Sequence, residues 1–490
     1  MYFIEHEKLT LSNGLEVILH EDHTLPTVAV NIWYHVGSKD EEKGRTGFAH
    51  LFEHVMFEGS KHYNQLYFEP LQQVGANING STTSDRTNYW ETLPSNYLEL
   101  ALWLESDRMG FLLDALDQKR FDIQRDVVKN ERRQSYENQP YGLAPMLLQP
   151  AVFPDPHPYS WNTIGSQEDL DAAKLDDVKD FFRQYYSPSN ASLTIAGDFE
   201  NTEVKRLIEC YFGSIPPGPS INRVDHMEST LRGEVRLAMR DKVQLPRLYL
   251  VWPSCAMFDK DEAPLDVLGT ALGDGKSSRL YRNLVYEKQI ARDVSVGNYG
   301  QEIAGEFYVQ ITANPGHSLE EIQDVVETEL ERVRREPLPD HELIRAKNRI
   351  ESYYIRLLER SGGFGGRADQ LNYYNVFAGN PDVINSDIER YMEVDGEDVA
   401  RVATSILGGN RVRLAVLSEK AICSSPSNID RSVMPSGSVS RTYDPPVPRR
   451  DCLPNGMNVL YIEKPELPIA GLGLLLRAGA TTDPDDRPGL

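Results

Sequence analysis

Hydrophobic and polar residues alternate along residues 9–36, and this alternation predicts strands. Asn13 and Gly14 interrupt it with a pair typical of a tight turn, so we expect one strand, a turn and two further strands. Further along, hydrophobic residues recur with the period of a helix in three stretches: residues 67–74, 97–116 and 118–138. Pro140 marks the end of the last helix. The first part of the chain therefore contains both strands and helices.

Residues 47–59 predict one short helix with a chemically distinctive face. Hydrophobic residues recur in it at spacings of three and four: Phe48, Leu51, Phe52, Val55 and Met56. His50 and His54 then lie one turn apart on the same face, with Glu53 beside them. Two such imidazoles are half of a tetrahedral zinc site, and a catalytic site adds a third protein ligand and a water whose proton Glu53 could accept. The alternative is a solvated helix face that carries two histidines by chance.

Residues 77–90 are expected to form part of a sheet. The latter half of this stretch is rich in residues that favour strands. Its opening, Asn79, Gly80, Ser81 and Thr82, has small side chains that would let another backbone approach closely. Such an edge could bind an extended peptide as an added strand. The alternative is a plain sheet edge followed by a polar turn.

Glu131 is a candidate for a third metal ligand. Val127, Val128 and Glu131 share one face of the helix predicted over residues 118–138, so we expect the carboxylate to point inward among hydrophobic neighbours. A carboxylate in that position needs a partner, because burying it unpaired is costly, and a metal ion could be that partner. A salt bridge to a neighbouring arginine is the alternative.

Length and charge narrow the classes of function. A chain of 490 residues exceeds a single core and predicts two or three domains. Its net charge of −23, with no long basic run, argues against a nucleic-acid partner. No hydrophobic run approaches the ~20 residues that span a membrane. The N-terminus lacks the features of a targeting segment, so we expect a cytoplasmic protein, or a periplasmic one if a signal peptide has been removed.

The motifs together resemble the inverted-zincin peptidases, the family of pitrilysin, insulysin and the mitochondrial processing peptidase. The resemblance rests on the segments His50–His54, Asn79–Gly80, Thr87–Tyr89 and Val127–Glu131. It continues through His157–Tyr159, Tyr185–Asn190 and Ala196–Asp198, so it spans the whole first domain. The fold that it implies is α+β, with two similar domains that each pack helices on one side of a sheet rich in antiparallel strands.

The resemblance also assigns roles to residues. It implies one zinc ion per chain held by His50, His54 and Glu131, with Glu53 as the general base. Asn79, Gly80, Ser81 and Thr82 would then receive the backbone of a peptide substrate. One departure is Gln124, because the family often places an acidic residue seven positions before the third ligand. Such a residue usually supports the ligands from behind, so the change could tune the site without removing zinc.

A second domain is expected after a linker in residues 214–232. The domains are then residues 1–220, which bind zinc, and residues 233–420, which resemble the family's second domain. Catalytic second domains of the family carry an arginine and, six residues later, a tyrosine that help to hold the substrate. Here the order is exchanged, with Tyr286 and Arg292, so that role cannot be carried over to this domain.

The chain contains an internal repeat. After a Ser- and Pro-rich linker in residues 424–450, Leu453-Pro454-Asn455-Gly456-Met457-Asn458-Val459 repeats Leu11-Ser12-Asn13-Gly14-Leu15-Glu16-Val17, and the same offset pairs Gly37 with Gly479 and Arg45 with Arg487. We therefore expect residues 451–490 to be the truncated start of a third similar domain. The chain would be the N-terminal half of a longer protein, and its partner would be the missing C-terminal half or a homologous subunit.

The sequence thus predicts a zinc endopeptidase that acts on oligopeptides or unfolded segments. Two other classes remain open. One is a catalytically silent scaffold or binding subunit with the same fold. The other is an interaction module in which zinc is structural, which would need a closed site of four ligands.

Overall fold

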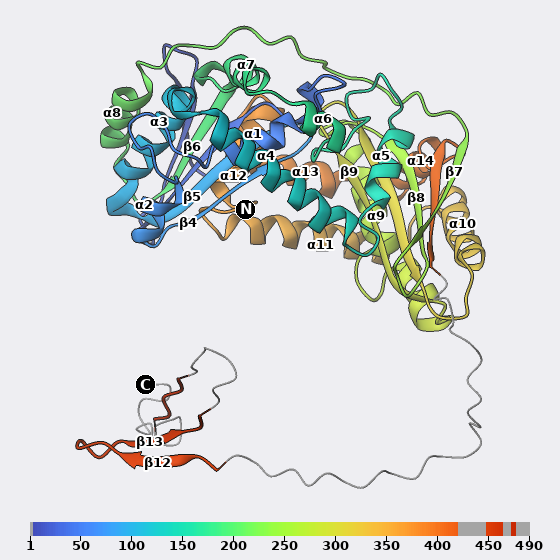
Figure 1. Ribbon diagram of the computed structural model, residues 1–490. Helices are drawn as coiled ribbons and strands as arrows, with labels where there is room; N and C mark the ends of the chain where they lie inside the picture. Colours follow the sequence, from blue (N-terminus) through green and yellow to red (C-terminus); the bar gives the residue numbers. More distant parts are fainter. Residues whose placement is uncertain (1–2, 420–446, 464–471, 477–490) are drawn as a thin grey trace. The chain divides into compact units, whose positions relative to one another are not determined.

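The computed structural model describes residues 3–419, 447–463 and 472–476 (Figure 1). Residues 1–421 belong to one compact unit, and residues 422–490 belong to a second. Both predicted peptidase domains therefore lie in the first unit. None of the helices in the described ranges is both long and apolar enough to cross a membrane.

The first half of the large unit is built on a six-stranded sheet with the order β1-β2-β6-β3-β5-β4. Its strands are β1 (Glu7–Thr10), β2 (Glu16–Glu21), β3 (Thr27–Tyr34), β4 (Asn77–Thr82), β5 (Thr87–Pro94) and β6 (Ala191–Gly197). Only the β2–β6 pair is parallel. Strand β4 lies at the edge, so one side of it has no neighbouring strand in the sheet.

Helices of the first half cover one face of this sheet. They are α1 (Phe48–Val55), α2 (Phe68–Gln73), α3 (Leu98–Ala115), α4 (Gln118–Arg132), α6 (Gln167–Ala172), α7 (Leu175–Tyr185) and α8 (Asn201–Phe212). A single hydrophobic core joins α1, α3, α7 and α8 to the sheet, with Leu51, Phe52 and Ile32 among its fully buried members. This burial is the main stabilising contribution to the half.

The second half repeats the arrangement. Its strands are β7 (Glu234–Asp241), β8 (Arg247–Ser254), β9 (Ala291–Gly300), β10 (Gly305–Ala313) and β11 (Arg411–Ser418), in the order β7-β11-β8-β10-β9. The sheet again has one parallel pair, β7–β11, which here lies at the edge, and the far edge is again a strand that follows the first helix, β9. Its helices are α9 (Glu262–Gly273), α10 (Leu319–Arg335), α11 (Asp340–Leu358), α13 (Asp387–Glu393) and α14 (Gly396–Ser405). Two similar α+β domains, as the sequence predicted, thus make up the unit.

The remaining faces of the two sheets are covered by exchanged helices. Helix α12 (Arg367–Phe377), from the second half, packs on β3 and β6 of the first sheet, where Ala368 contacts Ala29 and Ala196. Helix α5 (Ala144–Val152), from the first half, packs on β8 and β11 of the second sheet. Each sheet is therefore covered on one face by helices of the same half and on the opposite face by a helix of the other half.

The predicted linker in residues 214–232 contains no helix or strand, but it is tied to the surface. Ile215 and Leu231 are buried, and Arg223 donates a hydrogen bond to the carbonyl of His35 at 2.8 Å. The segment therefore follows the surface of the unit as a packed strap.

In the second unit, the described residues contain a hairpin of β12 (Arg449–Cys452) and β13 (Asn458–Tyr461). Its pairing repeats that of β1 and β2, because Arg449 faces Tyr461 as Glu7 faces Leu19. The turn repeats too, with Gly14 at φ +88° and Gly456 at φ +86°. Most of the predicted linker 424–450 and the later matches, such as Gly479 and Arg487, lie outside the described residues.

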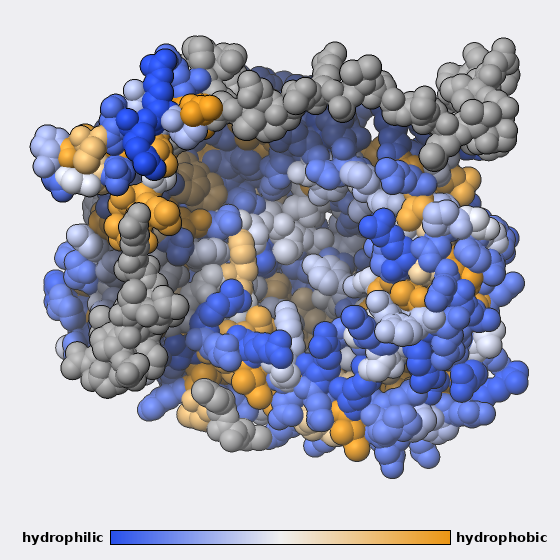
Figure 2. Space-filling model, turned by 90° about the horizontal axis from the view of Figure 1, so that it is seen from below, coloured by the Kyte–Doolittle hydropathy of each residue, from blue (hydrophilic) through white to orange (hydrophobic). Residues whose placement is uncertain are grey.

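The face seen in Figure 2 is mainly hydrophilic, with hydrophobic residues in small separate groups. Such a surface agrees with the strong acidic balance of the sequence.

Candidate metal centre and substrate strand

Helices α1 and α4 bring the three predicted ligands together. His50 Nε2 lies 3.7 Å from Glu131 Oε2, and His54 Nε2 lies 3.2 Å from the same oxygen. One ligand atom from each side chain can be chosen so that all three are within 4.8 Å of one another. Among the described residues, no other group of three or more His, Cys, Asp or Glu side chains has such spacing. The arrangement offers two nitrogens and one carboxylate oxygen, which is a common catalytic zinc set.

The start of α1 is fixed by two buried features. Gly47 has φ +88°, and a Cβ there would lie 2.9 Å from the carbonyl oxygen of Ile164, so a larger residue would be strained. The buried carboxyl group of Glu41 accepts hydrogen bonds from the backbone N–H groups of Gly47 and Ala49 at 2.9 and 2.8 Å. Burial raises the pKa of Glu41 to about 8. These contacts set the direction of the helix and hence of His50.

The electrostatics keep the imidazole of His50 available as a ligand. Burial, followed by the charge of His54, lowers the pKa of His50 to about 4. A neutral imidazole retains the lone pair that binds a metal. Nδ1 of His50 is buried and has no hydrogen-bond partner among the described residues. The hydrogen bond with His54 lowers the pKa of Glu131, which keeps that carboxylate ionised.

Glu53 lies between the ligands and the predicted substrate strand. Burial raises its pKa, and a hydrogen bond from Thr82 opposes that shift. Thr82 Oγ1 donates this bond to Glu53 Oε2 at 2.6 Å. A carboxylate in a less polar site is a stronger base than one in water, and this property suits a proton acceptor.

The strand β4 presents the four predicted peptide-binding residues at the sheet edge. Gly80 is packed closely, because a Cβ there would lie 3.0 Å from Phe57 and 3.1 Å from Tyr89. Asn79 Oδ1 accepts a hydrogen bond from the backbone N–H of Gly80 at 2.8 Å. The sequence placed the strand in the latter half of residues 77–90, whereas the structure shows a hairpin in which the opening residues are themselves a strand.

Helix α4 also carries Gln124 and Val127, for which the sequence analysis gave expectations. Gln124 Nε2 donates a hydrogen bond to Glu58 at 2.6 Å, so it reaches the segment after α1. The expectation that Val127 and Val128 share the buried face was wrong for Val127, because its exposed fraction is 41% and that of Val128 is 0%. The expectation for Val127 relied on helical spacing, which cannot show how far the neighbouring helices extend.

Two residues that the sequence did not single out support β4 from the other face of the sheet. Arg86 donates hydrogen bonds to the carbonyl and the hydroxyl of Ser81 at 2.8 and 2.6 Å. Asp369, on α12, accepts a hydrogen bond from Asn88 Nδ2 at 3.0 Å, and Asn88 Oδ1 accepts one from Ser81 at 2.7 Å. The second half thus takes part in holding the candidate substrate strand. The polar residue at 369 within a helical stretch was the only signal.

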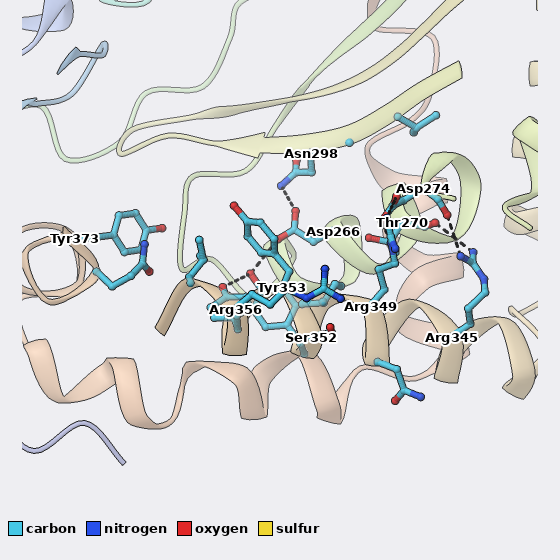
Figure 3. A pocket seen from close by; sticks show the side chains of 18 of the residues that line it. Asp266, Thr270, Asp274, Asn298, Arg345, Arg349, Ser352, Tyr353, Arg356 and Tyr373 are labelled. Carbon is cyan, nitrogen blue, oxygen red and sulfur yellow. Dashed lines mark hydrogen bonds and ion pairs between the residues drawn. The ribbon is translucent and has the colours of Figure 1, made fainter. Parts of the chain in front are cut away.

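The second half has a cavity of about 740 Å³ where its fold corresponds to the candidate metal centre (Figure 3). It lies between α9, α11 and β9, the counterparts of α1, α4 and β4. Asp266 and Thr270 are one turn apart on α9, but Asp266 accepts hydrogen bonds from Asn298 and Tyr391, and Arg345 donates to the carbonyl of Thr270. The ligand set is therefore absent from the described lining of this cavity, and the second half keeps the fold without the metal chemistry.

Tyr286 and Arg292, the exchanged pair, lie in this second half. Tyr286 is 65% exposed, and Arg292, at the start of β9, is also exposed. Neither side chain forms a hydrogen bond or ion pair with another described residue at the candidate metal centre. Neither residue therefore supports that centre within the described part of this unit.

Comparison with protein families follows the same division. The model described as "Insulinase (Peptidase family M16)" matches residues 16–157, which contain all the candidate ligands. The model described as "Peptidase M16 inactive domain" matches residues 172–350. The chain belongs to the M16 peptidase family. This membership agrees with the family resemblance of the motifs, and it places the inactive-domain match mainly on the half whose cavity lacks the ligands.

This M16 chain is similar in sequence and structure to several proteases along most of their length. The zinc protease PqqE of Helicobacter pylori is 29% identical over 413 residues, which cover 82% of this chain and 90% of that protein. The mitochondrial-processing peptidase subunit beta of Blastocladiella emersonii is 23% identical over 407 residues, with 81% and 85% covered. The crystal structure of a protease from Helicobacter pylori has a TM-score of 0.78 at 27% identity and covers 85% of this chain and 100% of that one.

Proposed function

We propose that this M16 chain is a zinc-dependent endopeptidase whose zinc ligands are His50, His54 and Glu131. The observation that carries the proposal is the convergence of the three ligand atoms within 4.8 Å, on two helices that a common core holds together. The donor set fits zinc, because it has two imidazole nitrogens and one ionised carboxylate and is open to further ligands. Bound zinc would supply Lewis acidity toward the carbonyl of the scissile peptide bond and toward water.

Glu53 is the general base in this proposal. Its carboxylate accepts a proton from the attacking water and then donates it to the leaving amine, so that one group serves both steps. Thr82 orients the carboxylate through the 2.6 Å hydrogen bond. The edge of β4 binds the peptide backbone through main-chain hydrogen bonds, so the substrates are oligopeptides or unfolded segments that can adopt an extended form.

The alternative is a silent scaffold of the same fold. A match to an inactive-domain model would favour it if that match covered the candidate ligands. The match begins at residue 172, whereas His50, His54, Glu53 and Glu131 all lie in the part that matches the insulinase model. A structural zinc module is less well supported, because it would need a fourth protein ligand beside these three.

Glu53→Gln is the decisive variant, because it removes the base but retains the shape of the side chain. We expect hydrolysis of a fluorogenic peptide to fall by at least about a hundredfold, while metal analysis still finds one zinc per chain. Unchanged hydrolysis would refute the role of Glu53. Loss of both zinc and activity would show that the residue acts on the ligands, and Glu336→Gln, an exposed change far from α1 in sequence, serves as the control.

We also propose that the active assembly includes a second pair of domains with this fold, either a C-terminal half or a homologous subunit. The proposal rests on the exchanged Tyr286 and Arg292 and on the repeated hairpin of β12 and β13. Addition of the separately expressed homologous half is expected to raise the rate of hydrolysis. An unchanged rate, with binding of the two halves demonstrated, would contradict it.

A further inference from the structure

A second cavity, of about 440 Å³, adjoins the end of the candidate substrate strand. Thr82, Thr83 and Ser84, the last residue of β4 and the two that follow it, form one part of its wall. Thr82 also donates the hydrogen bond to Glu53, so one lining residue of the cavity contacts the candidate base directly. A peptide that extends along β4 past Thr82 would therefore place a side chain at its mouth.

The two halves of the unit supply the other walls. Leu148, on the exchanged helix α5, and Phe153, just after it, form an apolar side from the first half. Val251 on β8 and Tyr308 on β10 come from the sheet of the second half. Polar side chains make up most of the rest of the lining, and a cavity of this size is typical of a binding site for a side chain or small ligand.

Among the described residues that line this cavity, Glu306 is the one with a charged side chain. It lies on β10, where its cross-strand neighbour on β9 is Tyr299, another lining residue. Its carboxyl group makes no hydrogen bond and no ion pair with any residue in the described part of the chain. Burial alone raises the pKa of Glu306 to about 7. A partly buried carboxyl group without a partner is costly, and a cationic ligand would remove that cost.

We infer that this cavity is a specificity pocket that takes a basic side chain of the peptide substrate, with Glu306 as its anionic partner. The inference rests on the proposed peptidase function and adds a substrate class to it. Lysine fits the chemistry of the lining, because its hydrocarbon stem can pack on Leu148, Phe153 and Val251 while its ammonium group reaches Glu306. The rings of Tyr299 and Tyr308 offer faces that also attract a cation.

The lining discriminates against other side chains. An acidic side chain would meet the charge of Glu306, and an aliphatic one would leave the carboxyl group unpaired in the closed pocket. A metal ion is a weaker candidate, because a single carboxylate with neutral neighbours such as Gln301 and Gln310 falls short of a usual ligand set.

The test uses internally quenched peptides that are identical except at one position, which is lysine, norleucine or glutamate, and this position is scanned along the peptide. At one position we expect the zinc-loaded full chain to favour lysine over norleucine by about tenfold or more in kcat/KM. Glu306→Gln should abolish that preference, because the rate on lysine falls with the loss of the anionic partner and the rate on norleucine rises with the loss of the unpaired carboxyl group. Glu306→Lys should reverse it, so that glutamate becomes the better substrate. Glu336→Gln, an exposed change in the same half, should behave as the unmodified chain.

A binding experiment separates this inference from the peptidase proposal. In the Glu53→Gln variant, fluorescence anisotropy measures binding of the lysine and norleucine peptides without turnover. Tighter binding of the lysine peptide that disappears with Glu306→Gln supports the pocket even if the unmodified chain hydrolyses nothing, a result that would overturn only the peptidase proposal. Equal binding and equal hydrolysis of lysine and norleucine at every position, or a preference that survives Glu306→Gln, would overturn the inference.

Discussion

Thr82 donates a hydrogen bond to Glu53 at 2.6 Å, and this bond joins the candidate substrate strand to the candidate general base. The two residues come from different elements, β4 and α1, separated by 28 residues of intervening chain. A movement of β4 on peptide binding would therefore change the position of the Glu53 carboxylate through this hydrogen bond. The bond thus couples the proposed place of substrate binding to the proposed proton acceptor.

Thr82→Val tests this coupling, because it keeps the shape of the side chain but removes the donor. We expect kcat for peptide hydrolysis to fall by about tenfold, in line with the loss of one hydrogen bond to a charged group. Zinc content should not change, because Thr82 does not contact the three ligands. Thr82→Ser restores the hydroxyl and should recover most of the rate. Equal rates for the valine and serine variants would rule out the hydrogen bond as the cause.

Metal binding should depend on each of the three candidate ligands. Glu131→Gln removes the negative charge and is expected to lower zinc affinity by at least about tenfold, measured by competition with a chelator. His54→Ala should lower it further. His317, an exposed histidine paired with Glu321 in the second half, provides the control, and His317→Ala should bind zinc normally. Full zinc affinity in the Glu131 variant would exclude that residue from the site.

The contact between the halves at Asp369 should contribute strongly to stability. Its carboxylate accepts hydrogen bonds from Trp33 at 2.9 Å and from Asn88 at 3.0 Å, and it is buried. Asp369→Ala leaves these donors unpaired, and we expect it to lower the free energy of unfolding by about 3 kcal/mol. Chemical denaturation measures the change. Asp382→Ala, which removes an exposed carboxylate paired with His6, should alter stability little.

A second contact between the halves predicts how stability varies with pH. Burial by itself would raise the pKa of Glu302, but the hydrogen bond from His35 and the charge of Lys39 outweigh burial and lower it to about 2. A carboxyl group with a lowered folded-state pKa adds stability at a pH above its unfolded value of ~4.5 and loses it as the pH falls toward 2.

Glu302→Gln should therefore remove stability at neutral pH but have a progressively smaller effect between pH ~4.5 and 2. Thermal unfolding at a series of pH values gives the difference between the two proteins. Because both proteins share all other titrating groups, the difference isolates this contact to a first approximation. A difference that stays constant through this range would show that the carboxylate does not titrate as its contacts with His35 and Lys39 require.

The sequence predicted the two helices that carry the candidate ligands. Residues 47–59 and 118–138 have hydrophobic periods that predict their helices, and the shared face of His50 and His54 follows from positions within one helical turn. The choice of Glu131 as a candidate ligand came from the family resemblance. The exchange of α5 and α12 was not predictable in this way. The hydrophobic pattern of a helix shows that one face is buried, but it does not identify the sheet on which that face packs.

The same limit explains the residues that were missed. Asp369 lies 281 positions from Asn88, and Glu306 lies far from Thr82 in the chain, so no periodic pattern connects them. Val127 was assigned to the interior because helical spacing puts it on one face with Val128 and Glu131, whereas its side chain is exposed in the structure. Long-range packing decides these positions, and a single sequence carries little information about it.

The exchange of helices has a consequence for how the chain can be cut. A protease that nicks the strap between α8 and β7 would produce an N-terminal and a C-terminal fragment. Helix α5 of the N-terminal fragment would remain packed on the sheet of the C-terminal fragment, and α12 would remain packed on the sheet of the N-terminal fragment. Such a nicked molecule should migrate as one species under native conditions and separate only in denaturant. Neither fragment would be soluble when made alone, because each would expose a bare sheet face, so co-production should rescue both.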